Sequence, residues 1–100
     1  MMLVKHHTKD GRDIVAVCDK ELIDRKFEEN GKQLDLTSEF YKGEEKDEME
    51  IGDIIRNADI VNLVGKRAVD LGLAEEVISK ENVIMIDGIP HAQAVLIQEE

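Results

Sequence analysis

The chain has 100 residues, of which 42% are hydrophobic and 36% are charged, and its net charge is −10. This length and hydrophobic content predict one core, and therefore a single domain over residues 1–100. The negative charge argues against direct DNA binding and against anionic membrane surfaces, because like charges repel over a distance of about 10 Å.

No apolar run approaches the roughly 18 residues that a membrane helix needs. The short N-terminal segment becomes polar at once, unlike a signal peptide. Cys18 is the single cysteine, so the chain cannot form an intramolecular disulfide, and a lone thiol fits a reducing compartment. These features predict a cytoplasmic protein.

Residues 2–18 have the pattern of a β-hairpin around an Asp10-Gly11 turn. A two-residue turn there places three pairs of residues opposite one another: Thr8 and Asp13, His6 and Val15, Val4 and Val17. The second strand is apolar on both faces, which predicts an interior position in the sheet. One helical turn or a tight corner is expected directly after it.

A second hairpin is predicted over residues 25–36, because Asn30-Gly31 is the strongest short hairpin signal in the chain. Its register pairs Glu29 with Lys32, Phe27 with Leu34 and Lys26 with Asp35. One face is apolar and the other polar, which is typical of a hairpin at the edge of a sheet.

The remaining elements alternate between helix and strand patterns. After a polar loop over 37–46, Asp47 and Glu50 resemble a capping box, and apolar residues recur with helical spacing from Ile51 to Ala58. Gly65 is expected to open a second helix that runs to about Val77. Strands are predicted over 60–64, 82–86 and 91–97, with a turn over 87–90.

Together these elements predict an α+β fold. We expect a mixed or antiparallel sheet of about five to six strands, with two main helices packed on one of its faces.

Gly65, Lys66 and Arg67 form a candidate anion-binding site. They follow a short apolar strand and begin a helix, where free backbone N–H groups and two cations meet. Phosphate or carboxylate would suit such a site, although the spacing of a Walker loop is missing. The alternative is an ordinary helix start, with Lys66 and Arg67 solvated or paired with Asp70.

Four further residues form a candidate pocket or shared surface: Asn62, Gly88, Pro90 and His91. Asn62 is a polar residue in an apolar run, and a buried amide needs hydrogen-bond partners. It would either fasten the turn over 87–91, which is the favoured interpretation, or line a pocket. His91 has the only side chain of this group that titrates near neutral pH.

No catalytic residue or metal site is indicated. His6 and His7 are adjacent on a strand and point to opposite faces, so they cannot chelate one metal together. The spacings of structural zinc sites are missing, and no cofactor motif is present. A nucleophile pair of Cys18 and His91 would require the fold to bring them together.

The chain resembles the archaeal family called domain of unknown function 424. The resemblance rests on these segments in this order: 15–19, 39–41, 60–69, 81–84 and 88–93. Only Gly72, inside the second helix, departs from what the family leads us to expect. The resemblance implies a stand-alone cytoplasmic α+β protein and assigns no activity.

The function is therefore unknown from sequence. The leading hypothesis is a non-enzymatic binding module with a protein or ribonucleoprotein partner, associated with translation or RNA processing. This link to translation or RNA processing rests on the kind of family and organism that the resemblance suggests, and not on a site in the sequence. One alternative is a domain that binds a phosphorylated metabolite, or a small enzyme using the same patch; another is a plain homodimer formed through a strand edge.

Overall fold

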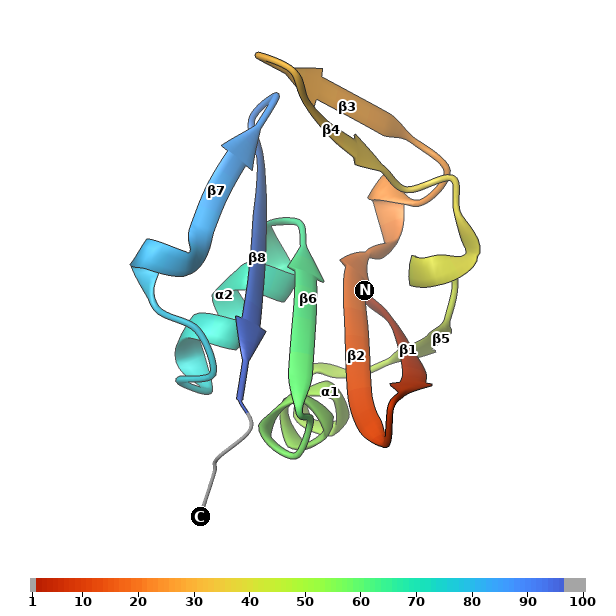
Figure 1. Cartoon of the computed structure of the whole chain (residues 1–100), viewed down its shortest axis with the longest axis vertical. Coiled ribbons are helices and arrows are strands. Elements are labelled where there is room, and N and C mark those ends of the chain that lie inside the picture. Colours follow the sequence, from red (N-terminus) through yellow and green to blue (C-terminus); the bar gives the residue numbers. More distant parts are fainter. Residues whose placement is uncertain (1, 97–100) are drawn as a thin grey trace.

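The computed structural model describes residues 2–96, which form an α+β fold with a six-stranded mixed sheet, a two-stranded sheet and two α-helices (Figure 1). The strands are β1 (Met2–Lys9), β2 (Arg12–Asp19), β3 (Lys26–Glu29), β4 (Lys32–Asp35), β5 (Glu44–Lys46), β6 (Ile60–Val64), β7 (Val83–Ile86) and β8 (Ile89–Val95). The helices are α1 (Glu48–Arg56) and α2 (Lys66–Ala74), and short 3-10 turns span Lys20–Leu22, Glu39–Tyr41 and Lys80–Asn82.

The large sheet has the strand order β5-β1-β2-β6-β8-β7. Strands β2 and β6 are parallel, and every other neighbouring pair is antiparallel. The predicted interior position of the second strand is confirmed, because β2 lies between β1 and β6. Its parallel neighbour requires a long crossover, which contains the small sheet, β5 and α1.

Both predicted hairpin registers are confirmed, with Val4 opposite Val17 and Phe27 opposite Leu34. The expected edge position of the second hairpin is wrong. Strands β3 and β4 form a separate sheet, and Phe27 and Leu34 pack with Cys18 in a cluster on one face of the large sheet. The apolar face of this hairpin is buried against that face rather than hydrogen-bonded at its edge.

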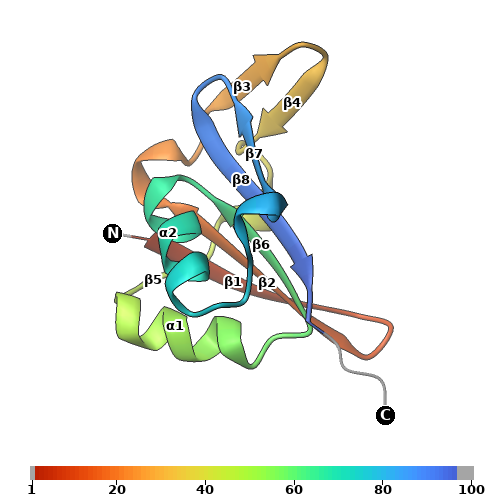
Figure 2. The same cartoon turned by 90° about the vertical axis from the view of Figure 1, so that its left-hand side faces the viewer.

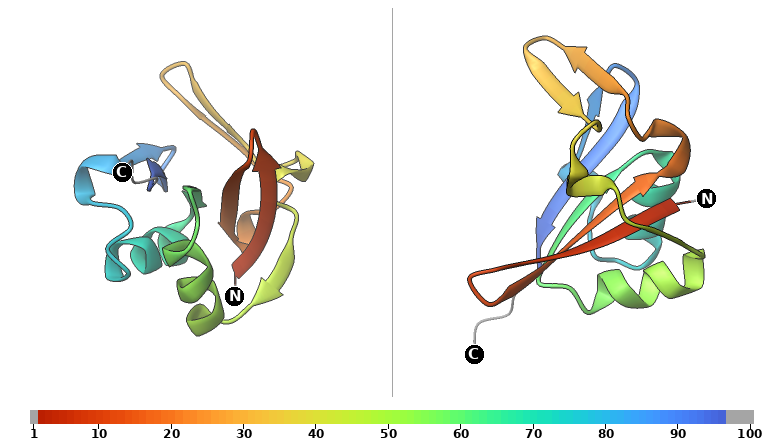
Figure 3. Two further views of the ribbon diagram at one scale, coloured as in Figure 1. Left: turned by 60° about the horizontal axis from the view of Figure 1, so that its bottom comes forward. Right: turned by 90° about the vertical axis from the view of Figure 1, so that its right-hand side faces the viewer.

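The two helices cover the opposite face of the large sheet, as predicted (Figure 3). Alternation along the strands divides the core: Val17 and Leu63 face the helices, whereas Cys18 and Val64 face the β3–β4 hairpin. The two faces of the sheet therefore have different coverings and different candidate sites.

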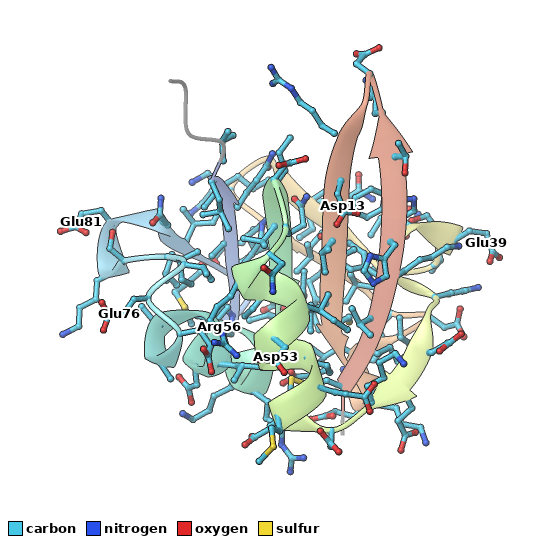
Figure 4. The ribbon with its side chains drawn as sticks, turned by 90° about the horizontal axis from the view of Figure 1, so that it is seen from below. Asp13, Glu39, Asp53, Arg56, Glu76 and Glu81 are labelled. Atoms are coloured by element: carbon cyan, nitrogen blue, oxygen red, sulfur yellow. The ribbon has the colours of Figure 1, made fainter. Side chains whose placement is uncertain are left out.

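The predicted cap of α1 is confirmed, because the Asp47 side chain accepts a hydrogen bond of 2.8 Å from the Glu50 N–H. The end of α1 is tied to the segment after α2 by Arg56, which forms ion pairs with Asp53 and with Glu75, the latter at 2.8 Å (Figure 4). Helix α2 ends at Ala74 rather than near Val77, since Glu76 has a positive φ of 60°.

Two further parts of the chain differ from the sequence prediction. The expected loop over 37–46 contains the 3-10 turn and β5, which pairs with the start of β1. Strand β8 begins at Ile89, so the turn before it is only Asp87-Gly88, with positive φ at both residues. The predicted strand end at Ile97 lies outside the described residues.

Candidate functional site

The start of α2 is built around a buried carboxylate. Asp19, which is 3% exposed, accepts hydrogen bonds from the N–H groups of Arg67 at 3.0 Å and Ala68 at 2.9 Å. The parallel pairing of β2 with β6 places Cys18 opposite Val64, so the two strands finish side by side at the same end of the sheet. Asp19 therefore takes the place of a helix cap from a distant part of the sequence.

This carboxylate explains the conformation of Gly65. Gly65 has φ 103°, and a Cβ there would lie 2.4 Å from the Asp19 Cγ. Burial raises the pKa of Asp19 above its ordinary value, whereas the two N–H groups and Arg67 act in the opposite direction. The pKa of Asp19 therefore depends on the two amides remaining hydrogen-bonded to its carboxylate.

The predicted anion site at Gly65, Lys66 and Arg67 already holds internal acids. The Arg67 amide and the next one along, that of Ala68, bond to Asp19, and the Lys66 Nζ lies 2.8 Å from an Asp70 carboxylate oxygen. Binding of an external anion stays a prediction, and such an anion would compete with Asp19 for the same N–H groups.

The predicted shared surface is divided between the two faces of the sheet. Asn62 lies opposite Gln93 and His91 lies opposite Val64, on the face that the β3–β4 hairpin partly covers. Pro90 has the other orientation in β8, and together with Gly88 it lines a groove beside α2. Asn62 and His91 therefore share one face of the sheet, whereas Gly88 and Pro90 line the groove beside α2. The four residues do not form one surface.

His91 lies in an apolar environment. Within residues 2–96, both of its ring nitrogens are buried without a hydrogen-bond partner, and burial lowers its pKa. The Asn62 side chain forms no hydrogen bond to the turn over 87–91 in the part of the chain that is described. That turn is held instead by Glu29, whose Oε1 accepts from the Asp87 N–H at 2.7 Å.

Cys18 and His91 do not form a nucleophile pair, because Val64 of β6 lies between them in the sheet. Burial, followed by the charges of Asp19 and Glu21, raises the pKa of Cys18 to about 12. The thiol is therefore protonated at neutral pH. Across the described residues, no group of three or more potential metal ligands is found.

A groove of about 370 Å³ separates α2 from the β7–β8 hairpin. Its floor and walls are mainly apolar, and two lysines and one aspartate complete its lining: Lys66, Val69, Asp70, Leu73, Lys80, Val83, Met85, Gly88 and Pro90. Three of the residues singled out from sequence, Lys66, Gly88 and Pro90, thus come together here. A wider depression of about 700 Å³ lies between α1 and α2, but its Lys46 and Arg67 are balanced by three acids, Asp47, Glu48 and Glu75.

The groove lies beside β7, two of whose residues, Val83 and Met85, line it. Strand β7 is an uncharged edge strand of the large sheet (Figures 1 and 2). Its sequence is Val-Ile-Met-Ile, with Ile84 41% exposed and Met85 55% exposed. The two-residue turn makes Ile86 and Ile89 a hydrogen-bonded pair, so the alternating ladder directs the N–H and C=O of Met85 and the C=O of Val83 outward. The Val83 N–H donates instead to the Lys80 C=O of the preceding turn. The opposite edge, β5, consists of Glu44, Glu45 and Lys46.

Sequence reasoning missed both Asp19 and the β7 edge. The signal for the edge was available in part, since Val83–Ile86 is a strand without a charged residue and ends at a tight Asp-Gly turn. A short apolar run of this kind is also typical of a strand buried inside a sheet. Only the strand order shows that β7 has one neighbour instead of two.

The comparisons with known proteins identify the family. The family described as protein of unknown function (DUF424) matches residues 6–97. The chain belongs to this family.

The fold also agrees with a known structure, the crystal structure of an uncharacterized conserved protein from Methanopyrus kandleri. Its TM-score is 0.82 at 18% identity, and the alignment covers 99% of this chain and 94% of that one. At this identity the likeness concerns the fold alone. None of the curated proteins matches the chain. Within the described residues, no helix is long and apolar enough to cross a membrane.

Proposed function

We propose that this DUF424 protein is a non-enzymatic interaction module that binds an extended segment of a partner protein along β7. The observation that carries the proposal is the uncharged edge strand with exposed Ile84 and Met85. Soluble proteins usually protect sheet edges with charges, prolines or bulges. An edge without such protection is suited to strand addition by another chain.

The backbone supplies the first part of the binding. The outward C=O of Val83 and the outward N–H and C=O of Met85 would pair with the added strand, as in an ordinary antiparallel or parallel ladder. Side chains supply the second part. Alternate residues of the added strand would face the groove beside α2, where Val69, Leu73 and Pro90 offer an apolar surface.

A protein partner is preferred over a nucleic acid for an electrostatic reason. The net charge of −10 opposes the approach of phosphates, and the start of α2 is occupied by Asp19. A ribonucleoprotein would fit only through one of its protein components. We place this interaction in the cytoplasm, which the unpaired thiol of Cys18 supports.

A screen of a random-peptide display library against the immobilised protein tests the proposal. Selected peptides are expected to contain alternating apolar residues, and in ¹⁵N NMR they should slow the exchange of the Met85 amide proton with water. Met85→Lys should weaken binding about tenfold, because it places a charge in the apolar contact. Met49→Lys is the matched control: Met49 is 82% exposed on α1, away from β7.

Two results would contradict the proposal. Peptides that bind Met85→Lys as well as the unchanged protein, or that leave the Met85 amide exchanging freely, would place the binding surface elsewhere. Protection of the Met85 amide by concentrated protein alone, absent when position 85 is lysine, would favour the alternative of a homodimer formed through the strand edge.

A further inference from the structure

We propose, on the basis of the proposed function, that the β7 edge selects an antiparallel segment with the charge order basic, apolar, acidic from its N-terminus to its C-terminus. The inference concerns which segments bind and in which direction. It rests on the different charges at the two ends of β7.

The end of β7 that follows Ile86 is acidic. Asp87 begins the turn there, and the Glu29 carboxylate is fixed beside it by a 2.7 Å hydrogen bond from the Asp87 N–H. Both residues are exposed. Because this hydrogen bond joins the tip of the β3–β4 hairpin to the turn, two carboxylates are gathered at one end of the edge.

The other end of β7 is basic on the side of the groove. Lys80 lines the groove and forms no ion pair with any carboxylate among the described residues. The side chain of its exposed neighbour Glu81 extends away from the turn (Figure 4). Lys80 is therefore the available charge for a ligand lying beside the groove.

These charges orient an added strand. In an antiparallel pair, the N-terminal part of the segment lies beside Asp87 and Glu29, and its C-terminal part lies beside Lys80. Antiparallel pairing is the slightly more stable of the two arrangements and continues the pattern of β7 with β8. A segment with a base first and an acid last then meets opposite charges at both ends, with its apolar residues over the groove.

Two end-capped peptides of identical composition test the inference. Both have an alternating valine and threonine core; one carries lysine at its start and glutamate at its end, and the second has these two charges exchanged. Both are neutral overall, so the net charge of the protein affects them equally. The lysine-first peptide should bind about three- to tenfold more tightly, as expected for a few exposed ion pairs.

Variants of the protein give the matched controls. Lys80→Glu should abolish or reverse the preference, and Asp87→Asn, which keeps a good Asn-Gly turn, should reduce it. Lys9→Glu makes the same charge change at the distant end of β1 and should leave the preference unchanged. Raised salt should reduce the preference, because exposed ion pairs are screened.

The outcomes separate this inference from the proposed function. Equal affinities, with the Met85 amide protected by both peptides, would overturn the charge order and leave strand addition intact. A preference for the glutamate-first peptide would overturn the antiparallel direction. Failure of both peptides to protect the Met85 amide, together with failure of the library screen, would overturn strand addition itself.

Discussion

Asp19 shows how one residue joins distant parts of the chain. Its carboxylate is buried at the end of β2, yet its hydrogen-bond donors are the amides of Arg67 and Ala68 at the start of α2. Gly65 leaves room for this contact, because any Cβ there would overlap with the carboxylate. The sequence predicted that an external anion binds at Gly65, whereas the carboxylate that lies there in the fold is the chain's own Asp19.

Asp19→Ala should lower the free energy of unfolding by about 1–3 kcal/mol, because it leaves two buried N–H groups without an acceptor. Asp19→Asn keeps one acceptor oxygen and avoids a buried charge, so its loss should be smaller. Urea denaturation followed by circular dichroism measures both. Equal stability of Asp19→Ala and Asp19→Asn would show that these hydrogen bonds contribute little.

His91 gives the fold a dependence on pH. Burial lowers the pKa of His91 below its ordinary value of 6.5, so the unfolded chain takes up the proton first as the pH falls. Stability should therefore decrease below the unfolded pKa, by at most about 1.4 kcal/mol per pH unit, until the folded pKa is passed. Above both values the contribution is constant.

The measurement compares the unchanged protein with His91→Phe between pH 7.5 and pH 5.5 (roughly one unit to either side of the ordinary histidine pKa). His6 and His7 remain in both proteins, so the difference isolates His91. The unchanged protein should lose stability relative to the variant as the pH falls. A difference that does not vary with pH would show that the pKa of His91 is the same in both states.

At the scale of elements, the packing of α2 on the sheet depends on Gly72. A Cβ at Gly72 would lie 2.4 Å from Leu63 Cδ1 and 3.1 Å from two atoms of Ile78. The helix thus approaches β6 so closely that only a glycine fits at this point. This is the residue that departs from what the family resemblance predicted.

Gly72→Ala should therefore destabilise the protein, although alanine favours a helix by about 1 kcal/mol over glycine. We expect a net loss of about 1–3 kcal/mol from overpacking. Gly52→Ala in α1 is the matched control, since its Cβ meets only the flexible end of Glu75. Thermal unfolding should show the loss for Gly72→Ala alone; equal effects of the two substitutions would contradict the packing argument.

At the scale of the whole molecule, charge is the dominant feature. The chain carries 23 acidic and 13 basic residues, and exposed carboxylates that repel one another disfavour the compact state. Local ion pairs such as Lys20–Glu45 and Lys42–Asp24 offset part of this repulsion at short range. Such exposed pairs contribute little individually.

Moderate salt should therefore stabilise the fold, because it screens the excess of like charges more than it weakens a few surface pairs. Thermal unfolding at low and at near-physiological sodium chloride concentration should show a rise in Tm. A fall in Tm would mean that the ion pairs contribute more to stability than the net charge removes from it.

The sequence by itself determined the local structure and the fold class. Both hairpin registers follow from Asp10-Gly11 and Asn30-Gly31, because these dipeptides accept the positive φ values that two-residue turns need. The cap at Asp47 and the apolar faces of the helices follow from spacing alone. These features depend on residues that are near one another in the chain.

Only the tertiary structure decided which candidate residues meet. The parallel pairing of β2 and β6 brought Asp19 to Gly65, and the strand order left β7 with one free edge. Alternation in β8 separated His91 from Pro90, although the two are adjacent in sequence. Non-local pairing is selected by the burial of the whole core, and no short pattern in the chain encodes that sum.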